Sequence, residues 1–228
     1  MAVYVITGGT TGIGAATRET LLSQGHEVFN IDYKGGDFIA DLSTREGCEN
    51  AVQAVYDKYP DGIDVLLCNA GVGPQVPATT LFSLNFFAAV EIAEGLRPLL
   101  KKKKGNCVIT SSNSIGHDTV HLDWAGILTD VMDRDRAMEF AKDIPMEQGA
   151  SSYATSKYAL ARWMRRVSGS WATDGLRINA IAPGNTTTPM TQNMTEEQMK
   201  GEIRGVIDKI DSVYKLFGFS YRIELSTC

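Results

Sequence analysis

Residues 2–14 of this chain read AVYVITGGTTGIG. The first half, Ala2–Thr7, is a short apolar run rich in β-branched residues that ends at a cluster of glycines, which predicts a buried strand. A helical pattern follows from Ala15 to about Ser23. Strand, glycine-rich turn and helix in this order predict a site for the phosphates of a dinucleotide. The glycines let the backbone approach the pyrophosphate, and the helix N-terminus offers unpaired N–H groups.

Strands and helices are expected to alternate along the rest of the chain. Short apolar runs bounded by turn residues predict further strands at Glu27–Ile31, Asp37–Ala40, Asp64–Cys68, Asn106–Thr110 and Arg177–Ile181. Helical patterns predict helices over Thr44–Tyr59, over Leu81–Leu100 and from the region of Tyr153 to about Thr173. We therefore predict one α/β domain over residues 1–228, with a Rossmann-type, doubly wound and mostly parallel sheet.

Two segments depart from simple alternation. Residues 117–149 have a helical pattern of their own and are predicted to form a helical insertion before Tyr153. Within residues 190–228, Thr195–Gln198 has the sequence of a capping box and opens a predicted helix that Gly218 ends. Phe219–Leu225 then alternates apolar and polar residues, as a half-exposed edge strand does.

The composition is that of an ordinary soluble protein. The net charge of −5 argues against nucleic acid or an anionic membrane surface as the main partner. The four cysteines have neither metal-ligand spacing nor the density of a disulfide framework, so no metal site is expected. No secretory signal is visible at the N-terminus, and no stretch approaches the ~18 uninterrupted apolar residues of a membrane span. We therefore expect a cytoplasmic protein.

The second predicted strand leads into Asp32, about 20 positions beyond the glycine turn. A carboxylate at this place can accept hydrogen bonds from a ribose 2′-hydroxyl and would repel a 2′-phosphate. No Arg or Lys lies within the glycine loop to offset that repulsion, although Lys34 is close. NAD is therefore favoured over NADP as the cofactor. The alternative is that Asp32 is a turn residue before Gly35 and Gly36.

Tyr153 and Lys157 stand four positions apart in the run SSYATSK at residues 151–157. On a helix this spacing puts both side chains on one face, one turn apart. A phenol near an ammonium has its charged form favoured, so its pKa falls toward the range useful for proton transfer. An exposed Tyr–Lys pair is usually a solvated helix face, and the predicted dinucleotide site is what favours a catalytic role here.

Several motifs in one order, over about residues 3–190, resemble those of the short-chain dehydrogenase/reductase family. The matching motifs are the cofactor loop from Thr7 to Gly14, the pair beside the adenine ring at Asp41-Leu42, the sheet-stabilising motif at Asn69–Gly71 and the segment that meets the nicotinamide at Pro183-Gly184 with Thr188. Five such motifs in order, counting the catalytic residues, are more specific than any one alone. The cofactor-binding residues that the resemblance implies are Thr7, Gly8, Thr11, Gly12, Ile13, Gly14, Asp32, Asp41, Leu42, Asn69, Ala70, Gly71, Tyr153, Lys157, Pro183, Gly184, Thr186 and Thr188.

The resemblance also implies a catalytic set of Asn85, Ser112, Tyr153 and Lys157. Tyr153 would be the general acid/base, and Lys157 would lower its pKa and bind the nicotinamide ribose. Ser112 would donate a hydrogen bond to the substrate oxygen, where charge develops as the hydride moves. Asn85 would hold a water that links Lys157 to solvent. Ser111 is the alternative to Ser112, ranked second because the family's serine is usually the latter of such a pair.

Two features depart from the usual family member. Tyr153 lies 41 positions after Ser112, where most members have little more than a short loop. A bacterial subgroup of 3α-hydroxysteroid dehydrogenases/carbonyl reductases resembles this chain in the extra helical segment, which would also alter the family's helix-to-helix subunit interface. Family members usually continue to a strand with an Asp-Gly-Gly ending, which Gly218–Cys228 lacks. Either Phe219–Leu225 substitutes for that strand or the C-terminus is altered.

By this resemblance, the chain is expected to be an NAD-dependent oxidoreductase that interconverts a secondary alcohol and a ketone. The expected substrate is a 3α-hydroxysteroid or 3-oxosteroid, and the expected assembly is a homodimer or homotetramer. Two alternatives stay open: a sugar or small-alcohol dehydrogenase of the same family, and a non-catalytic NAD-binding member. The intact set of Ser112, Tyr153 and Lys157 argues against the second alternative.

Overall fold

The computed structural model of this chain describes residues 1–186 and 188–191. These residues belong to one compact unit, Met1–Gln192. The predicted capping box, the helix after it and the tail at Phe219–Leu225 lie outside the described residues. For the same reason, the single domain predicted over residues 1–228 stays a prediction.

Within the described residues, six parallel strands form one sheet in the order β3-β2-β1-β4-β5-β6. The strands are β1 (Val3–Thr7), β2 (Glu27–Asp32), β3 (Phe38–Ile39), β4 (Val65–Cys68), β5 (Asn106–Thr110) and β6 (Arg177–Ile181). The chain winds outward from β1 to β3 and then returns to β4 beside β1, so the strand order reverses between β1 and β4. The predicted doubly wound fold is confirmed. Ligands of such sheets bind at the carboxyl ends of the strands near this reversal.

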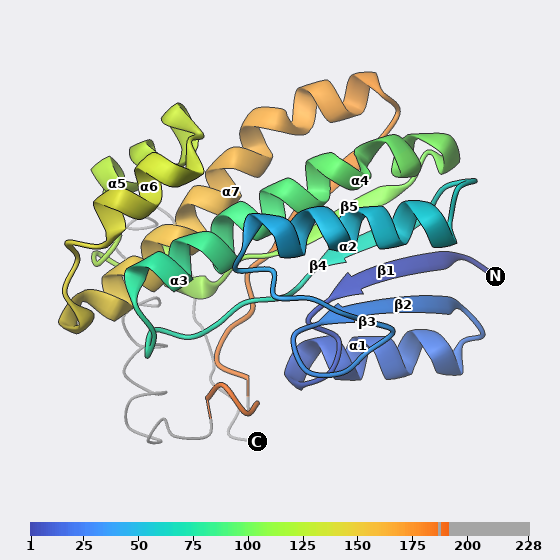
Figure 1. Ribbon diagram of the computed structural model, residues 1–228, viewed down its shortest axis with the longest axis horizontal. Coiled ribbons are helices and arrows are strands. Elements are labelled where there is room, and N and C mark those ends of the chain that lie inside the picture. Colours follow the sequence, from blue (N-terminus) through green and yellow to red (C-terminus); the bar gives the residue numbers. More distant parts are fainter. Residues whose placement is uncertain (187, 192–228) are drawn as a thin grey trace, which may run out of the picture. The chain divides into compact units, whose positions relative to one another are not determined.

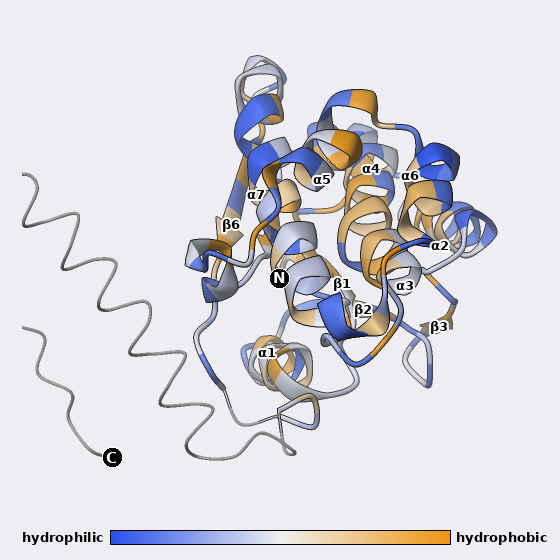
Figure 2. Ribbon diagram, turned by 90° about the vertical axis from the view of Figure 1, so that its left-hand side faces the viewer, coloured by the Kyte–Doolittle hydropathy of each residue, from blue (hydrophilic) through white to orange (hydrophobic). Residues whose placement is uncertain are grey.

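Helices lie on both faces of the sheet (Figure 1). The layer on one face is made of α2 (Arg45–Lys58), α4 (Ala89–Lys103) and α7 (Gly149–Thr173), and α1 (Gly12–Ser23) lies on the other face. Figure 2 shows the hydrophobic segments of these helices gathered around the sheet. The core lies between the sheet and the three-helix layer, where alternate strand residues such as Leu66, Cys107 and Ile109 are fully buried. None of the described helices is long and apolar enough to cross a lipid bilayer.

The first helix, α1, buries few large apolar side chains. Ile13 is half-buried, but Ala16 and Leu22 are exposed, and Gly14 is the buried residue of the helix. A Cβ on Gly14 would lie 2.0 Å from the carbonyl oxygen of Gly8. The helix therefore approaches the end of β1 through its backbone rather than through large side chains.

The helix predicted over Leu81–Leu100 is longer at both ends and contains a π-helical segment. It begins with α3 (Ala78–Phe82), continues through π-helical residues Ser83–Ala88 and ends with α4. A single π-helical turn inserts extra backbone into a helix, and such turns occur frequently at functional sites. The surrounding apolar residues keep a helical spacing, so the hydrophobic pattern alone predicts one uniform helix.

The predicted insertion is helical and is tied to the helix layer by ion pairs. It contains α5 (Leu122–Gly126), π-helical residues Ile127–Val131, α6 (Arg134–Ala141) and a 3₁₀ turn at Met146–Gln148. Asp130 accepts a hydrogen bond from Arg166 of α7. Arg134 donates to Glu91 of α4 and to the carbonyl oxygen of Ser43, both at 2.5 Å. Figure 1 shows the insertion beside α7 and the start of α3, at one end of the helix layer.

Candidate active site

The predicted site residues follow the carboxyl ends of four neighbouring strands. Thr7 ends β1, Asp32 ends β2, Asn69 follows β4 and Ser111 follows β5. The carboxyl ends of parallel strands meet at one edge of a sheet. The structure therefore brings the cofactor candidates and the catalytic candidates together at that edge.

The glycine loop between β1 and α1 has a backbone conformation and a close packing that require glycine. Gly8 and Gly12 have φ angles of +72° and +56°, which residues with a Cβ rarely adopt. A Cβ on Gly8 would lie 2.7 Å from Ala70 Cα, and one on Gly12 would lie 3.3 Å from Thr188. Thr11 precedes α1 without capping it through its side chain, so N–H groups of the first turn stay available to an anion. A glycine turn followed by a helix start with available N–H groups is the arrangement expected of a phosphate site.

The motif Asn69-Ala70-Gly71 joins the end of β4 to the glycine loop. The Thr7 hydroxyl accepts hydrogen bonds from the N–H groups of Asn69 and Ala70, both at 3.1 Å. Asn69 Nδ2 donates to the Gly8 carbonyl oxygen at 3.0 Å. These bonds fix the start of the loop to the neighbouring strand end.

Asp32 is oriented by two backbone N–H groups. Its Oδ2 accepts from Thr10 N at 3.0 Å, and its Oδ1 accepts from Tyr33 N at 2.7 Å. The carboxylate therefore lies against the glycine loop instead of projecting freely from a turn.

Asp41 and Leu42 offer different groups to a ligand. Asp41 is exposed, and its Oδ1 accepts from the N–H and the hydroxyl of Ser43 at 2.9 Å and 2.6 Å. The side chain of Leu42 is buried and belongs to the hydrophobic core. The pair therefore presents a carboxylate and backbone atoms at the sheet edge, while the leucine side chain supports the core.

Lys157 is a buried cation beside the end of β5. Only 4% of the residue is exposed, and its Nζ donates to the Thr110 carbonyl oxygen at 2.9 Å. Burial lowers the pKa of Lys157 from 10.5 to about 8. Tyr153 lies one turn earlier on the same helix, α7. The sequence did not identify the Thr110 carbonyl as a partner, because a backbone acceptor leaves no signal in the side-chain pattern.

The two candidate serines have different partners. Ser111 Oγ is buried and donates to the carbonyl oxygen of Lys157 at 3.0 Å, which joins β5 to α7. Ser112 Oγ accepts from the N–H of Ser114 at 3.2 Å, at the start of the 3₁₀ turn Asn113–Gly116, and donates a long hydrogen bond of 3.4 Å to Asn113 Oδ1. The hydroxyl of Ser111 thus donates its proton to the backbone of α7.

Asn85 lies in the π-helical segment and is fully buried. Its Oδ1 accepts from Val72 N at 2.9 Å, and its Nδ2 donates to Val72 O at 3.1 Å and lies 3.4 Å from Ser156 Oγ. A Cβ on Gly71 would lie 3.0 Å from Asn85 Oδ1 and 3.2 Å from Lys157 Nζ. Asn85 and Lys157 therefore border the same glycine.

The segment from Pro183 to Thr188 borders both the serine turn and the glycine loop. The Pro183 carbonyl oxygen accepts from Asn113 N at 3.1 Å. Thr186 Oγ1 donates to the Gly184 carbonyl oxygen at 3.1 Å. At the other end of the segment, Thr188 lies against Gly12 of the glycine loop.

Comparison with known proteins agrees with this geometry. The sequence model of a family described as "short chain dehydrogenase" matches residues 2–122 and 141–199. The chain belongs to this family. Short chain dehydrogenases are oxidoreductases that bind NAD(H) or NADP(H), so the family supplies the reaction type and the class of cofactor.

Relatives of this short chain dehydrogenase include proteins that act on hydroxysteroids. The chain is 35% identical to a 3-alpha-hydroxysteroid dehydrogenase/carbonyl reductase of Comamonas testosteroni over 89% of this chain and 79% of that protein. It is 27% identical to a short chain aldehyde dehydrogenase of Euphorbia lathyris over 90% of this chain and 73% of that protein. The crystal structure of a 3-alpha-hydroxysteroid dehydrogenase from Pseudomonas sp. B-0831, complexed with NADH, is similar with a TM-score of 0.80 and 34% identity, and the match covers 89% of this chain and 81% of that one.

The family model leaves a gap between its two matched segments, and this gap lies in the predicted insertion. Residues 123–140, which lie between the two matched segments, fall inside the predicted insertion at residues 117–149. They contain the whole π-helical segment that follows α5 and all of α6 except its last residue, Ala141. Only this part of the predicted insertion lies outside the family match, and its bounds at residues 117–149 stay a prediction.

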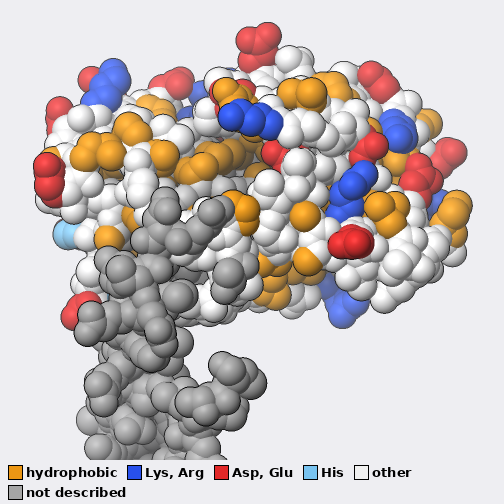
Figure 3. Space-filling model, turned by 90° about the horizontal axis from the view of Figure 1, so that it is seen from below, with side chains coloured by type: hydrophobic (Ala, Val, Ile, Leu, Met, Phe, Trp, Pro, Cys, Tyr) orange, Lys and Arg blue, Asp and Glu red, His pale blue; other side chains and the backbone are white. Residues whose placement is uncertain are grey.

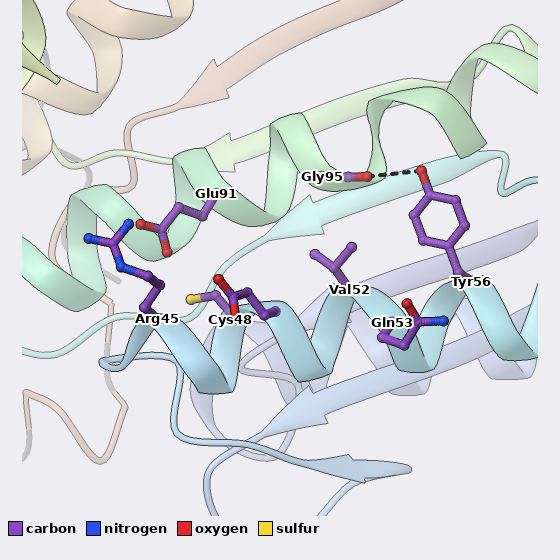
Figure 4. Close-up of a pocket in the computed structure, with 8 residues that line it drawn as sticks. Arg45, Cys48, Val52, Gln53, Tyr56, Glu91 and Gly95 are labelled. Carbon is purple, nitrogen blue, oxygen red and sulfur yellow. Dashed lines mark hydrogen bonds between the residues drawn. The ribbon is translucent and has the colours of Figure 1, made fainter. Parts of the chain in front are cut away.

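A hollow of about 440 Å³ between α2 and α4 lies apart from the dehydrogenase site (Figure 4). Its lining residues come from these two helices and not from the strand ends, and the Tyr56 hydroxyl donates to the Gly95 carbonyl oxygen at one end of it. Cys48 in its wall is 2% exposed, and burial raises the pKa of its thiol to about 12. A thiol of this kind is not a nucleophile at neutral pH.

Exposed apolar side chains are present near the dehydrogenase site. Met190, which is 47% exposed, lies within 3.3 Å of where a Cβ on Gly73 would be. The start of α7 touches the same loop, because a Cβ on Gly149 would lie 2.2 Å from the Pro74 carbonyl oxygen. Met146, just before α7, is 51% exposed. Figure 3 shows hydrophobic side chains gathered on the face seen from below.

Proposed function

We propose that this short chain dehydrogenase interconverts a secondary alcohol and a ketone at a centre made of Asn85, Ser112, Tyr153 and Lys157. The observation that carries the proposal is the buried ammonium of Lys157, which is held on the Thr110 carbonyl oxygen and borders Gly71 together with Asn85. A buried cation one helical turn from a tyrosine favours the ionised form of the phenol. That is the property a tyrosine needs to act as a base near neutral pH.

Each residue of the centre has a separate task in this proposal. Tyr153 takes the proton of the alcohol during oxidation and returns it to the carbonyl oxygen during reduction. Ser112 donates a hydrogen bond to the same oxygen, where negative charge develops. Lys157 holds the phenolate form of Tyr153, binds the ribose next to the nicotinamide and passes protons to a water held at Asn85. A nicotinamide cofactor, when bound, donates or accepts the hydride.

The proposed cofactor is NAD rather than NADP. Support comes from Asp32, whose carboxylate is held against the glycine loop by the N–H of Thr10 and would repel a 2′-phosphate. The solved Pseudomonas relative is complexed with NADH. The residues proposed to hold the cofactor are Thr7, Gly8, Thr11, Gly12, Ile13, Gly14, Asp32, Asp41, Leu42, Asn69, Ala70, Gly71, Tyr153, Lys157, Pro183, Gly184, Thr186 and Thr188.

The proposed substrate is a 3α-hydroxysteroid or the matching 3-oxosteroid. Two relatives at 34% and 35% identity are described as acting on 3α-hydroxysteroids. The exposed side chains of Met146 and Met190 offer apolar surface of the kind that a steroid ring system would cover.

The direct test is an assay of NADH formation, followed by its absorbance, with NAD and a panel of alcohols. Androsterone should be oxidised, while sugars and simple secondary alcohols should react more slowly. Faster turnover of a sugar or small alcohol would replace the steroid assignment with that class. Binding of NAD without turnover of any alcohol would show a non-catalytic family member and would overturn the proposed function.

A further inference from the structure

Asn30 is a buried amide on β2, where a parallel strand covered on both faces usually has an apolar residue. It is 1% exposed. Its Oδ1 accepts from Gly9 N at 2.8 Å, and its Nδ2 donates to Thr10 Oγ1 at 3.1 Å. A buried amide is costly unless it is hydrogen-bonded, and both ends of this one are bonded to the glycine loop.

The backbone of Asn30 binds the loop that joins β2 to β3. Its N–H donates to Asp37 Oδ2 at 2.8 Å, and its carbonyl oxygen accepts from Asp37 N at 2.9 Å. Two glycines leave space for the amide. A Cβ on Gly9 would lie 2.5 Å from Asn30 Oδ1, and a Cβ on Gly36 would lie 2.7 Å from Asn30 Nδ2. Asn30 therefore sits tightly between the glycine loop and the loop that joins β2 to β3.

The contact of Asn30 is the middle one of three consecutive bonds. Gly8 N donates to the Ile31 carbonyl oxygen at 2.9 Å, Gly9 N donates to Asn30 Oδ1, and Thr10 N donates to Asp32 Oδ2 at 3.0 Å. The glycine loop is thus fastened to β2 residue by residue. The Asn30 amide holds Thr10 in position, because it bonds the Thr10 hydroxyl and the N–H of Gly9. Thr10 in turn orients the Asp32 carboxylate through its own N–H.

We propose that Asn30 is a positioning residue that sets the choice between NAD and NADP by holding Thr10 against Asp32. Asn30 is buried below the loop and acts through Gly9 and Thr10 rather than by touching the cofactor. The inference rests on the proposed role of Asp32 in cofactor binding. Without the Asn30 amide, the loop can shift and the Asp32 carboxylate can turn away from the 2′-position of the ribose, which weakens its repulsion of a 2′-phosphate.

The test measures dissociation constants of NAD and NADP by calorimetry for the wild-type protein and for Asn30→Ala. The variant loses two hydrogen bonds to the loop. We expect the ratio of the NADP constant to the NAD constant to fall about tenfold, the effect of somewhat more than one hydrogen bond of ordinary strength. The ratio is independent of the fraction of folded protein, so a merely structural role of Asn30 would leave it unchanged.

Variants at Thr10 test the same link without disturbing the interior, because Thr10 is exposed. Thr10→Ala loses the acceptor of the Asn30 Nδ2 hydrogen bond and should lower the ratio by a smaller factor, while Thr10→Ser keeps a hydroxyl and should restore the ratio. Arg18→Ala is the matched control. Arg18 lines a hollow beside Asn30, and its Nε has no hydrogen-bond partner in the part of the chain that the structure describes.

Three outcomes separate this inference from the function on which it rests. A lower ratio in Asn30→Ala and Thr10→Ala, but not in Thr10→Ser or Arg18→Ala, supports it. Unchanged ratios in a wild-type protein that binds NAD would overturn the positioning role and leave the proposed function standing; if Asn30→Ala does not fold, Thr10→Ala decides. A wild-type protein that binds neither cofactor would overturn both.

Discussion

Lys157 is the single residue whose environment has the clearest measurable consequence. The folded protein lowers its pKa to about 8, whereas the unfolded chain has the ordinary value of 10.5. Between these values the unfolded chain binds more protons, so the free energy of unfolding should rise with pH in this window. Below the window the burial penalty of the charged Lys157 is present in full and does not change with pH. The size of the rise is about 3 kcal/mol.

Lys157→Met measures this contribution, because methionine has a similar length and carries no charge. The wild-type protein should gain about 3 kcal/mol relative to the variant between pH 8 and pH 10.5 in urea unfolding experiments. If the difference in unfolding free energy between the two proteins is constant with pH, burial does not lower the pKa of Lys157.

Replacing Asp32 tests its proposed role in distinguishing NAD from NADP. Asp32→Ala removes the carboxylate that would repel a 2′-phosphate, so the preference for NAD over NADP should fall about tenfold or more. Dissociation constants of both cofactors measure it, with Asp61→Ala, an exposed residue in the turn before β4, as the control. An unchanged ratio in Asp32→Ala would mean that Asp32 is a turn residue.

At this scale the sequence identified side chains better than their partners. The candidates Asn85, Lys157 and Asp32 all lie near the carboxyl ends of the strands, while their catalytic and cofactor roles stay predictions. The contact of Lys157 with the Thr110 carbonyl oxygen was not predicted, because every residue carries such an acceptor. Asn30 was overlooked although a polar residue inside a buried strand is a visible signal.

At the scale of elements, among the ion pairs that join the insertion to the helix layer, the one between Arg134 and Glu91 has little exposure to solvent. Arg134 and Glu91 have side chains that are 6% and 27% exposed, so Arg134→Met leaves a largely covered carboxylate without its partner. We expect the variant to lose about 3 kcal/mol of unfolding free energy. Arg45→Met is the matched control, because Arg45 and Asp135 are 53% and 89% exposed and should contribute less than about 1 kcal/mol.

Urea unfolding of the two variants measures the difference. A loss in Arg134→Met no larger than in Arg45→Met would mean that the Arg134 contact does not anchor the insertion on α4. Equal losses of unfolding free energy in the two variants would mean that the hydrophobic contacts of α5 and α6 hold the insertion on the helix layer.

The elements themselves show where sequence reasoning succeeded. The strands Asn106–Thr110 and Arg177–Ile181 were predicted to the residue, because each is a short segment that contains apolar residues and is closed by a polar or proline-containing turn. The π-helical segment at Ser83–Ala88 was not predicted. The apolar spacing around it is that of an ordinary helix, whereas the cause lies in tertiary contacts such as the amide of Asn85 on Val72.

At the scale of the whole molecule, the insertion bears on assembly. It covers one end of the helix layer beside α7, on the side where the family resemblance predicts contacts between subunits. We propose a homodimer or homotetramer formed through a different surface. Light scattering after size-exclusion chromatography should give a mass of two or four chains at micromolar concentration, and a mass of one chain would contradict the proposal.

Tyr153→Phe tests whether Tyr153 transfers the proton in an NAD-dependent alcohol oxidation. The variant keeps the half-buried aromatic ring at this position of α7 and removes only the hydroxyl. NADH formation with androsterone should fall by about 10²–10⁴-fold, while the dissociation constant of NAD stays close to that of the wild-type protein. Turnover at the wild-type rate in this variant would contradict the assignment.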